Sequence, residues 1–82
     1  TGHTLGAAGA TEAALCWLLL SDLNTKKILP AQCNQKPPDA SLPPIAIVRS
    51  TQALPHTKNL SMLSNSFAFG GSNAAVILSR QA

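Results

Sequence analysis

The chain has 82 residues, of which 45% are hydrophobic and 11% are charged, and its formal net charge is +3. Ordinary soluble domains carry about 25% charged residues, so the composition argues against a free-standing domain and predicts a piece that other protein covers. The six basic residues are spread along the chain without forming a run, which argues against a nucleic-acid-binding protein.

Two further classes are disfavoured. The longest strongly apolar stretch, residues 13–20, is far shorter than the roughly 20 residues that cross a bilayer, so we expect no membrane span and no signal peptide. Cys16 and Cys33 fit neither a metal motif nor a redox C-x-x-C pair, so we expect no metal ion and no cofactor. A reducing, cytoplasmic location is the default for such a chain.

A helix is predicted over residues 7–23, where strong helix formers predominate. Leu15, Leu18 and Leu19 share one face at helical spacing. Because Cys16, Trp17 and Leu20 extend the apolar surface around most of the circumference, we expect this helix to be buried on nearly all sides.

A proline-rich arm and a hairpin are predicted to follow the helix. All six prolines lie between residues 30 and 55, so residues 28–60 should run as an irregular surface arm. The β-branched run at 45–48 predicts one short strand within it. The apolar segments 60–69 and 73–80 flank a glycine turn and predict a β-hairpin, whose residues 74–78 should be buried on both faces of a sheet. The fold class is therefore α/β.

The first motif that can carry chemistry is Gly-His-Thr-Leu-Gly-Ala-Ala-Gly-Ala, at residues 2–10. The helix N-terminus carries partial positive charge, which disfavours an imidazolium, so we expect His3 to be neutral and able to donate a hydrogen bond to an oxyanion. The small residues 6–10 allow a neighbouring element to approach closely. On chemistry alone, a structural histidine is the more common case.

The second motif is Asn-Ser-Phe-Ala-Phe-Gly-Gly-Ser-Asn, at residues 65–73. Gly70 and Gly71 can adopt positive φ angles and expose main-chain N–H groups as an anion-binding nest. The spacing matches no nucleotide-binding fingerprint. On spacing alone, an ordinary hairpin turn with two core phenylalanines is the simpler interpretation.

The two motifs together, in this order and at this separation, resemble the C-terminal end of the elongating β-ketoacyl-acyl carrier protein synthases, which have a thiolase-like layered fold. The resemblance covers essentially the whole chain and implies that residues 1–82 are an incomplete domain. It implies a decarboxylative Claisen condensation of an acyl thioester with a malonyl thioester in fatty acid or polyketide biosynthesis. The implied partners are an acyl carrier protein, the N-terminal part of the same domain and a second copy in a homodimer.

The resemblance also assigns catalytic roles by position. His3 matches a histidine that helps decarboxylate the malonyl group and stabilises the enolate. Phe69 matches the gating phenylalanine, whose backbone N–H contributes to the oxyanion hole. Gly70 and Gly71 match the turn that lets this loop move.

Three further positions are expected to support the site. Glu12 matches a glutamate that pairs with a lysine upstream of the histidine, and without that lysine it should be a poorly compensated charge. Asn65 and Asn73 are expected to fix the loop.

The sequence departs from the family pattern in two kinds of position. Ala68 stands where the family usually has glycine, which should stiffen the gate loop, and Ser72 stands where it usually has threonine. The family's nucleophilic cysteine matches neither Cys16 nor Cys33, since Cys16 lies in the apolar helix, which disfavours a thiolate. We therefore expect the 82-residue chain alone to be inactive.

Two alternatives to a condensing synthase remain open. A thiolase would carry a second catalytic cysteine in the C-terminal glycine loop, and residues 67–73 have none. A chain-length-factor-like subunit would keep the fold without a nucleophile, and His3 and Glu12 argue mildly against it. His56 matches no family motif and is interpreted as an exposed loop residue.

Overall fold

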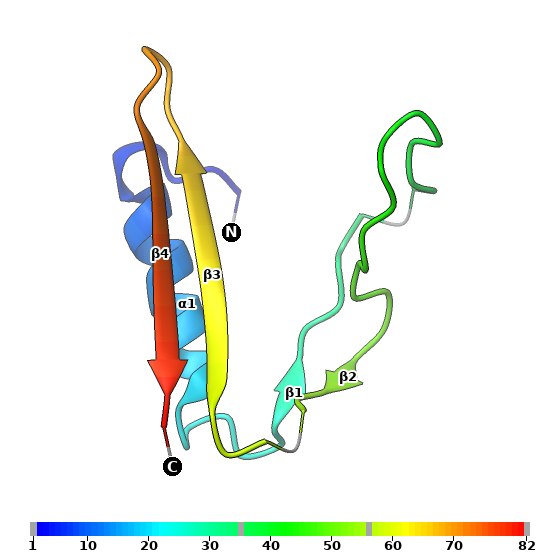
Figure 1. The fold of residues 1–82 in the computed structure, drawn as a ribbon, viewed down its shortest axis with the longest axis vertical. Helices are drawn as coiled ribbons and strands as arrows, with labels where there is room; N and C mark the ends of the chain where they lie inside the picture. The colour runs from blue at the N-terminus through cyan, green and yellow to red at the C-terminus, as the bar shows by residue number, and fades with distance from the viewer. Residues whose placement is uncertain (1, 35, 56, 82) are drawn as a thin grey trace.

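The computed structural model describes residues 2–34, 36–55 and 57–81. In chain order its elements are the 3-10 turn η1 (Leu5–Ala7), helix α1 (Ala8–Leu20), the short strands β1 (Ile28–Leu29) and β2 (Gln52–Ala53), and the long strands β3 (Leu60–Phe67) and β4 (Asn73–Arg80). Helix α1 lies along the β3–β4 hairpin, and β1 and β2 belong to an arm beside it (Figure 1). The predicted mixture of helix and sheet is confirmed, with two antiparallel pairs, β1–β2 and β3–β4, in the described residues.

Helix α1 forms within the predicted range but ends at Leu20, three residues earlier than predicted. The Ser21 hydroxyl donates a hydrogen bond to the carbonyl of Leu18 (2.8 Å), and the Asn24 side-chain amide donates one to the carbonyl of Leu19 (3.0 Å). These side chains satisfy carbonyls that the helix leaves without an intrahelical partner. Their contacts explain the early end.

The prediction that this helix is buried on nearly all sides is wrong for the described chain. Leu20 is buried, whereas Leu15, Trp17 and Leu18 are exposed. Only one face of α1 lies on the hairpin, because the hairpin is the one element that packs along it in the described ranges. The apolar sequence pattern extends around more of the helix than this chain covers.

The predicted hairpin is confirmed. Strands β3 and β4 pair antiparallel from Leu60↔Arg80 to Phe67↔Asn73, and residues 68–72 make the turn. Alternate residues of β3, such as Met62 and Ser64, are the less exposed ones and face α1. The expected burial of residues 74–78 on both faces is wrong, since all but Leu78 are exposed.

The arm differs from its prediction in where its strands form. Residues 45–48 are not a strand; instead β1 and β2 pair through Ile28↔Ala53 and Leu29↔Gln52. The β-branched run has no neighbouring strand to pair with in the described residues, and only the Gln32 N–H donates a hydrogen bond to the Val48 carbonyl (2.7 Å). Within the same residues, no helix is long and apolar enough to cross a membrane.

Candidate functional site

The fold brings the two sequence motifs to the same end of the helix–hairpin unit. Helix α1 starts beside the place where β3 ends, so residues 2–7 and the 68–72 turn lie at the same end (Figure 1). At the contact, a Cβ atom added to Gly9 would lie 3.3 Å from the Ser66 Oγ. The predicted close approach of the small-residue segment is therefore confirmed at Gly9.

His3 lies in an exposed segment ahead of α1, with the turn η1 between them. The Ala7 N–H donates a hydrogen bond to the Thr4 carbonyl (3.1 Å), which closes this turn. Leu5 has a φ of 54°, a left-handed conformation that is uncommon for a residue other than glycine. Among the residues that the structure describes, none forms a hydrogen bond with the His3 imidazole. Its ring is thus free to meet a ligand.

The 68–72 turn is closed by main-chain hydrogen bonds. The Ala68 N–H donates to the Ser72 carbonyl (2.8 Å), and the Gly71 N–H donates to the Ala68 carbonyl (3.3 Å). Gly70 and Gly71 have φ angles of 93° and 87°, so the predicted positive φ angles are confirmed. The turn therefore depends on glycine at both positions.

Phe69 lies at the tip of this turn with its ring fully exposed. Its N–H has no acceptor among residues 2–34, 36–55 and 57–81, so it is available to a ligand. Phe67 is also exposed, at 76% of its accessible surface. The simpler interpretation of two core phenylalanines is therefore wrong for this chain.

Within the described residues Glu12 forms no ion pair, and its carboxylate makes a polar contact with the hairpin. The Ser64 hydroxyl donates a hydrogen bond to Glu12 Oε2 (3.2 Å), and Ser64 is a buried residue of β3. This contact joins α1 to the hairpin one turn from Gly9. Sequence reasoning missed Ser64 because a serine in a strand carries no signal of a partner 52 residues away.

Asn65 and Asn73 are exposed strand residues, paired with Ala75 and Phe67. In the described part of the chain, neither side chain makes a hydrogen bond, and the turn is held by the backbone. Their loop-fixing role stays a prediction.

The remaining candidate residues do not converge on the two motifs. Cys16 is half-buried in α1, and Cys33 is exposed in the arm. No group of three or more histidine, cysteine or acidic residues gathers within the described ranges as a metal site would. His56 lies outside the described residues.

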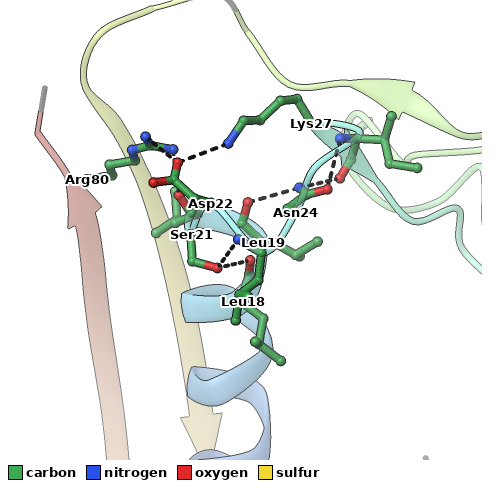
Figure 2. Close-up of polar contacts among 10 residues, drawn as sticks. Leu18, Leu19, Ser21, Asp22, Asn24, Lys27 and Arg80 are labelled. Carbon is green, nitrogen blue, oxygen red and sulfur yellow. Dashed lines mark hydrogen bonds and ion pairs between the residues drawn. The ribbon is translucent and has the colours of Figure 1, made fainter.

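A second polar cluster joins the other ends of α1 and β4 (Figure 2). Asp22 Oδ1 pairs with Arg80 Nη2 at 2.7 Å and with Lys27 Nζ at 3.5 Å. Arg80 Nη1 also donates a hydrogen bond to the Leu20 carbonyl (3.2 Å). The Arg80 charge beside Asp22 holds the pKa of that carboxyl below its usual value, with smaller contributions from its hydrogen bonds to Arg80 and Lys27. Through these contacts, Arg80, the last residue of β4, is bound to the C-terminal end of α1.

Comparison with known proteins adds the decisive observation. The chain is 37% identical to the 3-oxoacyl-[acyl-carrier-protein] synthase 2 of Rhizobium meliloti (strain 1021), covering 96% of this chain and 17% of that protein. It is 38% identical to the corresponding synthase 2 of Coxiella burnetii (strain RSA 493 / Nine Mile phase I), covering 98% of this chain and 18% of that protein. The resemblance to the β-ketoacyl-acyl carrier protein synthases is confirmed.

The mitochondrial 3-oxoacyl-[acyl-carrier-protein] synthase of Arabidopsis thaliana is likewise similar, at 37% identity over 94% of this chain and 15% of that protein. The chain thus spans about a sixth of the length of these relatives. No family model and no solved structure matches it. The similarity to these β-ketoacyl synthases extends over nearly the whole chain.

Proposed function

We propose that this chain forms part of the active site of a β-ketoacyl-acyl carrier protein synthase of fatty acid biosynthesis. In the reaction, the malonyl thioester loses carbon dioxide and the resulting enolate attacks the carbonyl of an acyl thioester. A carbon–carbon bond forms, and the thiolate of the nucleophilic cysteine leaves. Neither Cys16 nor Cys33 matches that nucleophile, so the rest of the synthase supplies it.

One observation carries the proposal: two hydrogen-bond donors without internal partners lie in motifs at the same end of the helix–hairpin unit. The His3 imidazole and the Phe69 N–H both lack partners in the described residues. Unpaired, preorganised donors are what an enzyme uses to stabilise negative charge as it develops in a transition state. We assign the enolate oxygen to His3 and the oxyanion hole to Phe69.

The remaining residues of the two motifs act in support. The exposed Phe69 ring on the Gly70–Gly71 turn is suited to open and close an acyl pocket, because the two glycines have no side chains and a Cβ at either would meet nothing within 4 Å. Glu12 contacts Ser64 and so holds α1 against the hairpin. Asn65 and Asn73 flank the turn and would contact the rest of the domain.

The proposed partners are an acyl carrier protein that brings both thioesters and a second synthase copy in a homodimer. The names of the relatives support the carrier protein, since each is a 3-oxoacyl-[acyl-carrier-protein] synthase. No residue of this chain is assigned to carrier docking.

A chimaeric enzyme tests the proposal. The matching segment of the Rhizobium meliloti synthase is replaced by this chain, and decarboxylation of malonyl carrier and condensation with acyl carrier are both measured. We expect the chimaera to condense. Replacing His3 by Ala should lower the decarboxylation rate by about 10²- to 10³-fold, the usual effect of removing an oxyanion donor.

His56→Ala in the same chimaera is the matched control, because His56 is the chain's other histidine and lies outside both motifs. It should leave both rates unchanged. A folded chimaera that does not condense would contradict the proposal and favour the chain-length-factor-like alternative. Retained decarboxylation in the His3→Ala chimaera would remove His3 from the mechanism.

A further inference from the structure

The end of the molecule opposite the two motifs holds a basic hollow that the sequence does not reveal. Lys27, Lys58 and Arg80 all line a cavity of about 270 Å³, together with apolar residues such as Leu20 and Leu54. These three residues are half of the chain's six lysines and arginines. Residues that look scattered along the sequence are therefore gathered by the fold.

Hydrogen bonds to main-chain groups position two of the three basic residues, Lys27 and Arg80. Lys27 has a φ of 53°, and its carbonyl accepts a hydrogen bond from the Leu54 N–H (2.9 Å). A lysine keeps a left-handed backbone conformation only where the surrounding structure stabilises that conformation. Arg80 is fixed by the Leu20 carbonyl (3.2 Å). The hollow is thus built by α1, the arm and β4 together.

The charge in this hollow is only partly compensated. Asp22 accepts from both Arg80 and Lys27 but does not itself line the cavity. Lys58 forms no ion pair or hydrogen bond with any of the described residues. Three cations with one carboxylate leave a net positive charge of two around a concave site, which is the complement of a dianion.

We propose that this hollow binds a phosphate group. A phosphate dianion matches the net charge, and its several oxygens can accept from lysine and arginine donors on three sides. The cavity is also large enough for a phosphate that carries a short apolar substituent over Leu20 and Leu54. This site is separate from the proposed condensation chemistry and does not rest on it.

A titration of the folded chimaeric synthase that carries this chain, with inorganic phosphate as the ligand, tests the site, because the 82 residues are only about a sixth of the length of the relatives. Amide shifts are followed by NMR in ¹⁵N-labelled protein at constant ionic strength, with chloride replaced stepwise by phosphate. We expect saturable shifts at residues 27, 58 and 80 and a dissociation constant on the order of a millimolar. Butyl phosphate, run in parallel, distinguishes a phosphate ester from free phosphate by its tighter binding.

Lys58→Gln is the informative variant, because it removes a charge without breaking any hydrogen bond or ion pair among the described residues. It should weaken phosphate binding about fivefold. Lys26→Gln is its matched control: Lys26 is an exposed neighbour of Lys27 that does not line the cavity, so its loss should change the affinity less than twofold. Equal weakening by both variants would show a general charge effect and overturn the site.

A second measurement does not depend on spectral quality. Phosphate that binds the folded chimaera raises its thermal unfolding midpoint relative to chloride at equal ionic strength. We expect this rise in the unsubstituted chimaera and in Lys26→Gln, and a smaller rise in Lys58→Gln. The absence of both saturable shifts and a midpoint rise at ~20 mM phosphate would refute the proposal.

Discussion

The Asp22 carboxylate is the residue whose charge state should control the junction between α1 and β4. Its pKa is lowered from the ordinary value of 3.8, chiefly by the charge of Arg80. A lowered pKa in the folded chain means that the pairing stabilises the fold fully above the unfolded pKa. The contribution is lost as the pH falls through the folded pKa. Asp22→Asn should therefore lower the thermal midpoint at neutral pH and reduce its further fall as the pH drops below the ordinary aspartate pKa of 3.8.

Asp39→Asn is the control for this experiment. The pKa of Asp39 is also lowered, by hydrogen bonds from the Ser41 hydroxyl (2.7 Å) and the Ser41 N–H (2.9 Å). Those bonds stay within a local turn of the arm, so the midpoint of the helix–hairpin unit should not move. An equal acid dependence in wild-type and Asp22→Asn chains would contradict the role of the Asp22 cluster.

For single residues, the sequence predicts backbone conformation better than it predicts which side chains contact one another. The positive φ angles of Gly70 and Gly71 follow from the residue type. The Glu12–Ser64 contact does not, because it joins residues 52 positions apart. The convergence of Lys27, Lys58 and Arg80 on one hollow is hidden for the same reason. Contacts between residues far apart in the sequence can be predicted only once the topology of the fold is known.

At the scale of elements, the contact between α1 and β3 depends on the absence of a side chain at Gly9. A Cβ there would lie 3.3 Å from Ser66 Oγ, tighter than ordinary contact. Gly9→Val should force the helix from the hairpin and lower the free energy of unfolding by about 1–3 kcal/mol, the usual cost of overpacking. Urea unfolding followed by Trp17 fluorescence, at one fixed chain concentration, measures this change.

Gly6→Val is the matched control, since a Cβ at Gly6 would meet nothing within 4 Å. Both variants place the same branched side chain near the start of the helix, so they share most of any cost in local propensity. If the two variants lost equal stability, the Gly9 contact would not be what brings the helix close to the hairpin.

The elements themselves were predictable where a local pattern decides them. Helix formers and the glycine turn predict α1 and the hairpin because both are built from contacts close in sequence. The prediction of a strand at 45–48 is wrong, and the sequence did not predict β1 and β2. A strand of two residues forms wherever the fold places two segments side by side, and strand propensity does not determine that. The hydrogen bond from the Leu54 N–H to the Lys27 carbonyl lies between the same two segments of the arm.

For the whole molecule, surface area explains the shortage of charged residues. The chain exposes 6841 Å² and has a radius of gyration of 14.4 Å. A compact monomer of its mass would expose roughly 4,700 Å² and have a radius of gyration of about 12 Å. The excess is more than the roughly 800 Å² that one partner contributes to a standard interface. The expectation that other protein covers this chain agrees with both quantities.

Self-association of the isolated 82-residue chain follows from the apolar part of that surface. Leu63 and Ile77 face each other across the outer side of the hairpin and are 57% and 68% exposed. Burial of such side chains is worth about 1.5–3 kcal/mol each, so two copies gain by covering them. Sedimentation should show species larger than 8.5 kDa.

Ile77→Lys should weaken this association about tenfold, because it removes one of the apolar contacts and adds a charge to the face. Thr51→Lys adds the same charge to an exposed position of the arm and should leave the association nearly unchanged. A wild-type chain that sediments as a monomer and unfolds cooperatively would contradict the argument, because its exposed leucine and isoleucine side chains would then need no cover.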